Sequence, residues 1–274
     1  MDEQDIETAR SFARKVDFGR AAEDYGKHRA GFPDHFFERI VAQLGLTPGL
    51  RALDLGTGTG SIARGLARLG LTVTAIDPSE ALMAQARRLD AEAGVQVDYR
   101  PGAAEALPFA DGVFDVVLAG QCWHWFDRPA AAREAARVLR SGGALVIAHF
   151  DWLPLPGNMV EATEDLIRTY SPDWGLGRGT GLYPHWLAGM SGAGFGGIET
   201  ASFDVAQPYS HEGWRGRIRA SAPVKASLDA AAVARFDADL ATLLAERFPQ
   251  DPLAVPHRVW WAAGRKGAPF ADIP

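Results

Sequence analysis

Hydrophobic residues along this chain alternate between short aliphatic runs and longer stretches in which apolar positions recur every three or four residues. Runs of four to eight residues separated by amphipathic helical stretches are typical of βαβ units and a mainly parallel sheet. The runs that we interpret as strands lie at residues 51–55, 71–76, 95–99, 114–119 and 144–148. The pattern therefore predicts an α/β fold from residue 51 onward.

The stretches between these runs have the signals of helices. Ile62 and Leu66 lie on one face of a helix that follows the first strand. Ser79 is suited to cap a second helix, because its side-chain oxygen can accept a hydrogen bond from an unpaired backbone amide. A third helix begins at Asp127 and ends at Leu139, where a Ser-Gly-Gly sequence follows.

The alternation is looser after residue 150, where Pro, Gly and Trp are frequent. Here the pattern predicts helices at 159–170, 184–192 and within 211–248, and strands at 199–205 and 257–264. We expect one compact domain with four parts. They are an N-terminal helical cap (1–40), a cofactor-binding core (41–149), a lid insertion (150–182) and a C-terminal part of the sheet with inserted helices (183–274).

Charge and composition limit the possible partners. The chain has a formal net charge of -6, whereas binding to nucleic acid requires clustered Lys and Arg. No apolar run approaches the ~18 residues that span a bilayer. The only cysteine, Cys122, cannot form an internal disulfide. We therefore expect a cytoplasmic protein that binds neither nucleic acid nor membrane, and the sequence predicts no metal site.

A glycine-rich turn with an acidic residue before it follows the first strand. Glycines at 56, 58 and 60 allow a ligand to approach the backbone amides closely. NAD-binding folds use a similar turn, but their pattern needs a glycine where this chain has Ser61. The carboxylate of Asp54 would repel a pyrophosphate and suits the ammonium group of a methionine moiety.

A second acid, Asp77, comes at the end of the second strand. There it can accept hydrogen bonds from both hydroxyls of a ribose, a role that NAD and S-adenosylmethionine sites share. The alternative interpretation of both acids is turn chemistry, since Asp is common at strand ends. The acids and the three glycines together favour ligand binding.

In five segments the chain resembles the class I S-adenosylmethionine-dependent methyltransferases. The segments are 53–60, 75–79, 102–109, 114–117 and 137–143. The resemblance implies a Rossmann-like, seven-stranded, mostly parallel sheet whose last strand is antiparallel. It also implies S-adenosyl-L-methionine as cofactor and S-adenosyl-L-homocysteine as product. The cofactor-binding residues that we expect are Asp54, Gly56, Thr57, Gly58, Gly60, Asp77, Pro78, Ala104, Glu105, Gly120 and Gln121.

One position departs from the pattern of that family. Many relatives have an acid at the position of Ala103, where it holds the adenine amino group. The backbone of Ala104 and the side chain of Glu105 are candidates to replace it. The alternative is that Glu105 is an ordinary surface acid before a turn.

Residues 120–127 follow the fourth strand and should face the reacting methyl group, because ligands of doubly wound folds lie at the carboxyl ends of the strands. His124 is the candidate catalytic base, since imidazole titrates near physiological pH. The alternative is a histidine packed among aromatic rings. The His-Trp pair and residues 25–33 resemble the trans-aconitate methyltransferase-like branch. The candidate substrate-binding residues are Tyr25, His28, Arg29, Trp123, Trp125, His149 and Trp152.

The sequence thus predicts an enzyme that transfers a methyl group to a small molecule by in-line displacement. Such a reaction needs alignment, exclusion of water and, for a protonated nucleophile, a base. We favour O-methylation of a carboxylate or hydroxyl over N- or C-methylation. The alternatives are an NAD-linked oxidoreductase and a non-catalytic protein that binds S-adenosylmethionine. The sequence makes no prediction of oligomeric state.

Overall fold

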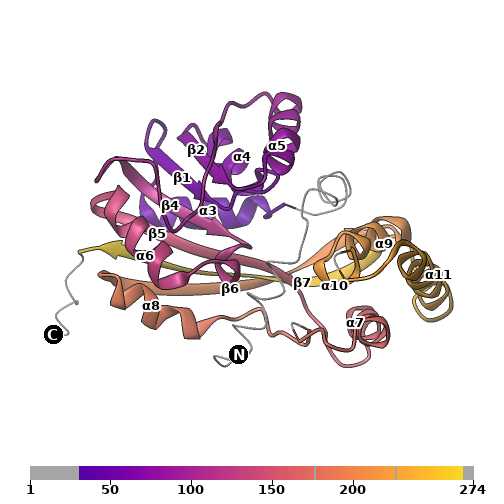
Figure 1. The fold of residues 1–274 in the computed structure, drawn as a ribbon. Helices are drawn as coiled ribbons and strands as arrows, with labels where there is room; N and C mark the ends of the chain where they lie inside the picture. Colours follow the sequence, from indigo (N-terminus) through magenta and orange to yellow (C-terminus); the bar gives the residue numbers. More distant parts are fainter. Residues whose placement is uncertain (1–30, 176, 226, 268–274) are drawn as a thin grey trace. The chain divides into compact units, whose positions relative to one another are not determined.

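The computed structural model describes residues 31–175, 177–225 and 227–267, and its fold is shown in Figure 1. Seven strands form one sheet in the order β3-β2-β1-β4-β5-β7-β6. They are β1 (Arg51–Leu55), β2 (Thr72–Asp77), β3 (Asp98–Pro101), β4 (Phe114–Gly120), β5 (Leu139–Trp152), β6 (Phe195–Tyr209) and β7 (Leu253–Lys266). Strands β1 to β5 pair in parallel. The predicted seven-stranded, mostly parallel sheet with an antiparallel last strand is confirmed.

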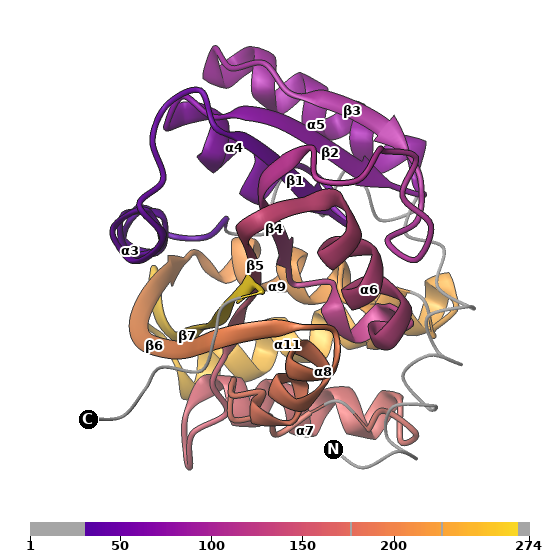
Figure 2. The ribbon, with the colours of Figure 1, turned by 90° about the vertical axis from the view of Figure 1, so that its left-hand side faces the viewer.

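The helices of the described residues lie before β1 and between later strands. They are α3 (Asp34–Leu44), α4 (Ser61–Arg68), α5 (Glu80–Ala93), α6 (Arg128–Val138), α7 (Met159–Tyr170), α8 (Leu187–Gly192), α9 (His211–Arg219), α10 (Ala222–Lys225) and α11 (Ala230–Arg247), with short turns η2 (Trp123–Trp125) and η3 (Pro184–Trp186). Of these, α4, α5 and α6 come between strands of the parallel part. Figure 2 shows α4 and α6 on opposite sides of β1 and β4. Parallel crossovers are right-handed, so connections that leave β1 and β4 in opposite directions place their helices on opposite faces. None of the helices in the described ranges has both the length and the apolar character that crossing a bilayer requires.

Several boundaries agree with the sequence pattern. Strand β1 and helix α7 have the predicted bounds. Ser79 caps α5 as expected, and its hydroxyl accepts from the amide of Leu82. Strand β3 begins at Asp98 rather than at Val95, because the amide of Val95 closes the end of α5 on the carbonyl of Asp90. The aliphatic Val95 therefore belongs to a helix end and not to the strand.

Strands β5, β6 and β7 are all longer than their aliphatic runs predict. The additional residues at their ends are often polar or small, so the hydrophobic pattern does not identify them as strand residues. The 15 residues of β6 alternate between half-buried and exposed side chains along most of their length. Pairing within the sheet thus extends each strand beyond the hydrophobic segment that reveals it.

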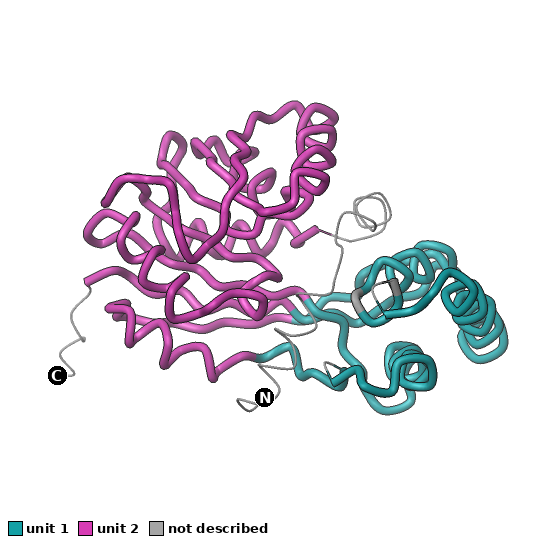
Figure 3. The backbone as a smooth tube through the Cα atoms, in the orientation of Figure 1, with its two compact units in different colours: residues 1–30, 151–182, 204–258 teal, residues 31–150, 183–203, 259–274 magenta. Residues whose placement is uncertain are grey.

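The chain divides into two compact units, drawn in different colours in Figure 3. Among the described residues, unit 2 contains 31–150, 183–203 and 259–267. Its core includes the fully buried side chains of Leu53, Val117 and Leu145 from neighbouring strands. Burial of β1 and β4 on both faces is what near-continuous apolar runs predict for parallel strands.

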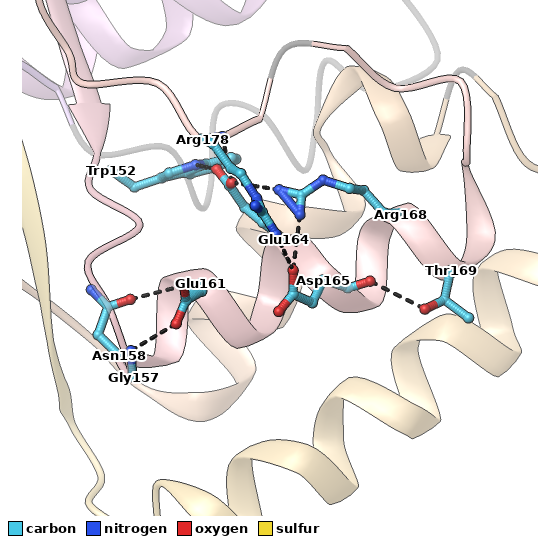
Figure 4. A network of polar contacts seen from close by, with 9 residues as sticks. All are labelled: Trp152, Gly157, Asn158, Glu161, Glu164, Asp165, Arg168, Thr169 and Arg178. Atoms are coloured by element: carbon cyan, nitrogen blue, oxygen red, sulfur yellow. Dashed lines mark hydrogen bonds and ion pairs between the residues drawn. The ribbon is translucent and has the colours of Figure 1, made fainter.

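Unit 1 contains residues 151–182 and 204–258 of the described chain. Its separate core includes Trp214, Phe236 and Leu240. The segment that we interpret as a lid lies in this unit, apart from residue 150. Figure 4 shows the polar network of α7, in which the buried carboxylate of Glu164 accepts hydrogen bonds from the indole of Trp152 and the backbone of Arg178.

Candidate functional site

The glycine-rich turn joins β1 to α4 at the carboxyl edge of the sheet in unit 2. Gly56, Gly58 and Gly60 all have positive φ, at 59°, 54° and 78°, a conformation in which residues other than glycine are strained. A Cβ at Gly60 would lie 2.4 Å from the hydroxyl of Tyr99, whereas a Cβ at Gly58 would meet no atom of the described residues within 4 Å. The turn is thus packed at Gly60 and open beside Gly58, where a ligand could approach the backbone.

Asp54 is the second-last residue of β1 and precedes this turn. Its side chain is buried, and its carboxylate accepts hydrogen bonds from the hydroxyl of Thr57 at 2.6 Å and the amide of Ala63 at 3.2 Å. Burial, with a smaller contribution from Asp77, raises the pKa of Asp54 to about 7. A cation bound beside it would favour the ionised form. The site is therefore suited to a ligand ammonium group.

Asp77 connects the end of β2 to the turn. One of its carboxylate oxygens accepts from the amide of Gly58 at 2.9 Å, and the other accepts from the amide of Ser79 at 2.8 Å. Burial raises the pKa of this carboxyl as well. Each oxygen can accept a further hydrogen bond, so the contacts within the turn leave capacity for ligand hydroxyls. Pro78 is exposed beside it.

The segment after β4 contains a strained backbone. Gln121 has a φ of 65°, and residues other than glycine in this region cost about 1–3 kcal/mol. Its amide donates to the carbonyl of Ala148, and its side chain donates to the carbonyl of Phe150. At Gly120 a Cβ would lie 2.4 Å from Ile62. The backbone at Gly120 therefore packs closely against helix α4.

The structure brings His124 and His149 together from the ends of β4 and β5. Their ring centroids are 5.3 Å apart. His124 lies 4.3 Å from the ring of Trp125, and the buried His149 lies 4.3 Å from the ring of Tyr183 and 4.9 Å from that of Trp186. Two titratable rings are thus held in an aromatic environment within unit 2. Such an environment suits either a proton-transfer role or packing.

The remaining candidates of unit 2 are less exposed to a ligand than the sequence suggests. Trp123 belongs to the hydrophobic core and contacts Phe126 at a ring distance of 5.8 Å. Ala104 is buried. The carboxylate of Glu105 accepts from the amide of Asp127 at 2.8 Å. Glu105 therefore supports the start of α6, which agrees with turn chemistry rather than with an adenine contact.

The other candidate substrate residues lie elsewhere. Tyr25, His28 and Arg29 are outside the described residues. Trp152 belongs to unit 1, where its indole donates to Glu164 at 2.9 Å. Within the described ranges no cluster of three or more His, Cys, Asp or Glu side chains could hold a metal ion.

The sequence analysis did not identify three side chains that support the glycine-rich turn, those of Arg64, Asp90 and Tyr99. Arg64 donates to the carbonyl of Thr59 at 2.6 Å and forms an ion pair with Asp90 at 3.0 Å, and Tyr99 donates to Asp90 at 2.7 Å. The signal was present in the sequence. Asp90 is four residues after the buried Ala86 on α5, and an acid at that spacing falls on the apolar face.

Comparisons with known proteins agree with this geometry. Residues 53–147 match the family model described as a methyltransferase domain. S-adenosylmethionine is the methyl donor of such a domain, and the matched residues include the whole turn from β1 to α4 and Asp77.

Two curated relatives and one solved structure extend the comparison. An uncharacterized protein of Mycobacterium tuberculosis is 31% identical over 186 residues, which cover 61% of this chain and 64% of the relative. A ubiquinone biosynthesis O-methyltransferase of Caulobacter is 43% identical over 109 residues, 38% of this chain and 43% of the relative. A solved structure from Anaeromyxobacter dehalogenans, described as a candidate type II methyltransferase, has 25% identity and a TM-score of 0.61, covering 86% of this chain and 97% of that one.

The chain therefore spans less than two thirds of the length of these curated relatives. The similarity to the O-methyltransferase is confined to a part of the chain that is little longer than the matched domain.

Proposed function

We propose that this protein is an S-adenosylmethionine-dependent methyltransferase that transfers the methyl group to a small-molecule acceptor. The observation that carries the proposal is the open turn beside Gly58 with the buried carboxylates of Asp54 and Asp77 on either side of it. In this arrangement Asp54 would hold the ammonium group of the cofactor and Asp77 its ribose. A non-nucleic-acid substrate belongs to the same proposal and is supported by the net charge of -6. A cytoplasmic location also belongs to it, and its support is the single cysteine.

Oxygen is the acceptor atom that we favour. Support comes from the O-methyltransferase among the relatives and from the two histidines at the carboxyl edge. His124 lies next to His149 and could accept the proton of a hydroxyl acceptor during the displacement. A carboxylate acceptor would need no base, and there the same rings would serve to exclude water. Membership of the trans-aconitate methyltransferase-like branch remains part of this proposal.

Calorimetric titration with S-adenosylhomocysteine and with NAD tests the cofactor. We expect saturable binding of S-adenosylhomocysteine and none of NAD. Asp77→Ala should weaken that binding by at least tenfold, because a ribose hydroxyl would lose a charged acceptor. Asp98→Asn, which removes an exposed carboxylate of β3, is the control and should bind as the wild type does. Tight binding of NAD alone would point to the oxidoreductase.

Binding without turnover is the second alternative. Incubation with methyl-labelled S-adenosylmethionine and a mixture of hydroxy and carboxylic acids would separate it from catalysis. Label in a product supports the proposal. If the cofactor binds tightly and label enters none of the acceptors, the protein is a binding protein with respect to these acceptor classes.

A further inference from the structure

Unit 1 holds a cation that the proposed methyl transfer does not use. Arg217 lies on α9, and its guanidinium carbon is 4.8 Å from the centre of the Trp152 ring. The residue is half-buried, and the side chain of Tyr209 is among the groups that favour its charged form. Burial is the main cause that lowers the pKa of the Arg217 guanidinium, although arginine keeps its charge in proteins.

The aromatic surface beneath this cation is held rigidly. The indole of Trp152 donates to Glu164 at 2.9 Å, and the indole of Trp214 donates to the neighbouring Thr163 at 3.1 Å. The two indole rings are 5.5 Å apart at 71°. Glu164 also accepts from Arg168 and from the backbone of Arg178 (Figure 4). Trp152 therefore presents its face to Arg217 from a position that helix α7 fixes.

The neighbouring arginines of α9 show what is unusual about Arg217. Arg215 and Arg219 both form ion pairs with Glu212 and Asp237. Arg217 forms no ion pair with any carboxylate in the described part of the chain, although the charge of Asp151 favours its charged form. Removing a cation from water without a paired anion costs on the order of several kcal/mol of folding free energy. A ligand with a negative charge would offset part of that cost.

The chemistry of this surface selects a carboxylate. A guanidinium group has a planar fork of N–H donors that matches the two oxygens of a carboxylate. One face of the Arg217 group is covered by Trp152, so a carboxylate would pair with the N–H donors at its edge. The rings of Trp152, Trp214 and Tyr209 favour an apolar or aromatic body beside that carboxylate.

We propose that Arg217 anchors a binding site in unit 1 for the carboxylate group of a small aromatic or apolar acid. The site is formed by Arg217, Trp152 and Tyr209, with Trp214 behind them. The inference concerns unit 1 alone and does not depend on the proposed methyl transfer.

Titration of the full chain with benzoate, and with benzamide as its uncharged analogue, tests the site. Quenching of tryptophan fluorescence and calorimetry report binding. We expect saturable binding of benzoate and at least tenfold weaker binding of benzamide. Arg217→Met should weaken benzoate binding at least tenfold, and Arg217→Lys should retain part of it, because it keeps the charge without the fork.

Arg247→Met is the matched control. Arg247 is an exposed arginine of unit 1 whose guanidinium also lies over an aromatic ring, that of Phe248 at 5.4 Å. This variant should bind benzoate as the wild type does. Titration of each variant with S-adenosylhomocysteine checks that unit 2 is folded, and the circular dichroism spectrum checks the helices of unit 1.

Three results would overturn the proposal. They are the absence of saturable benzoate binding to the wild type, equal affinity of folded Arg217→Met and wild type, and equal affinity of benzoate and benzamide. If Arg217→Met does not fold, the comparison of Arg217→Lys with Arg247→Met decides. Equal benzoate affinity in those two variants would also count against the site.

Discussion

Asp54 keeps its proton at a pH where an exposed aspartate has lost it. Its pKa is raised to about 7 by burial, whereas the unfolded chain has the ordinary value near 3.8. Between these two values the folded state binds a proton that the unfolded state has released. The contribution of Asp54 to stability therefore decreases as the pH rises from about 4 to about 7, and it is constant above that.

The first prediction concerns this carboxyl. Without cofactor, Asp54→Asn should be at least as stable as the wild type at pH 8, because a neutral amide oxygen can still accept from Thr57 and Ala63. The free energy of unfolding, measured with urea from pH 5 to pH 8, should vary less in the variant. The affinity for S-adenosylmethionine should increase with pH through 7 in the wild type only. A parallel pH dependence in both proteins would contradict the assignment.

The second prediction separates the two roles open to His124. If the ring accepts a proton from the acceptor, His124→Asn should lower kcat by about a hundredfold or more and remove the lower limb of the pH-rate profile. The affinity for S-adenosylhomocysteine should change by less than threefold. His35→Asn, an exposed histidine paired with Glu38, is the control. An unchanged rate across pH would leave His124 as an aromatic packing residue.

At the scale of elements, the turn from β1 to α4 depends on two elements that come later in the chain. Tyr99 of β3 donates to Asp90 of α5, and Asp90 forms an ion pair with Arg64. Arg64 in turn donates to the carbonyl of Thr59. A polar contact of this kind in a buried place contributes about 1–2 kcal/mol, and more when a charged partner is left without it. The geometry of the cofactor turn is thus set partly from outside it.

The third prediction follows from that support. Tyr99→Phe should weaken binding of S-adenosylhomocysteine three- to tenfold and lower the free energy of unfolding by about 1–2 kcal/mol. Glu92→Gln removes the exposed pair between Arg88 and Glu92 on the same helix and should change neither quantity. Calorimetry and urea denaturation measure the two effects. Lower stability with unchanged affinity would show that Tyr99 supports α5 and not the turn.

The sequence predicts elements well where local and tertiary preferences agree. The run of β1 is apolar, short and bounded by a glycine turn, and α7 has a cap residue and an apolar stripe, so both bounds are as predicted. β5 to β7 are longer than predicted, because their outer residues gain partners only when distant strands pair with them. Strand pairing of this kind leaves no local pattern.

The candidate site shows the same division. Asp54, Asp77 and the three glycines follow each other at spacings that a sequence reveals, and the structure places them together. The ion pair between Arg64 and Asp90, and the position of Arg217 on Trp152, join residues far apart in the sequence. The helical spacing places Asp90 on the apolar face of α5, but the sequence does not reveal its partner Arg64, nor the contact of Arg217 with Trp152.

At the scale of the whole molecule, the two units have separate hydrophobic cores. Proteins open in cooperative units that often coincide with such cores. In unit 1 the carboxylate of Glu164 holds α7 to the segment that contains Arg178, whose φ is 61°. Loss of this carboxylate should loosen unit 1 first.

The fourth prediction is that Glu164→Gln speeds hydrogen exchange in α7 and around Arg178 while the amides of β1 and β4 keep their rates. Replacement of a buried charged acceptor costs about 2 kcal/mol, which corresponds to roughly thirtyfold faster opening. Glu161→Gln on the same helix removes the charge from one acceptor, that of the Gly157 amide at 2.7 Å, and should have a smaller effect. Equal acceleration in β1, β4 and α7 would mean that both cores open in a single step, and exchange resolved by peptide distinguishes the two outcomes.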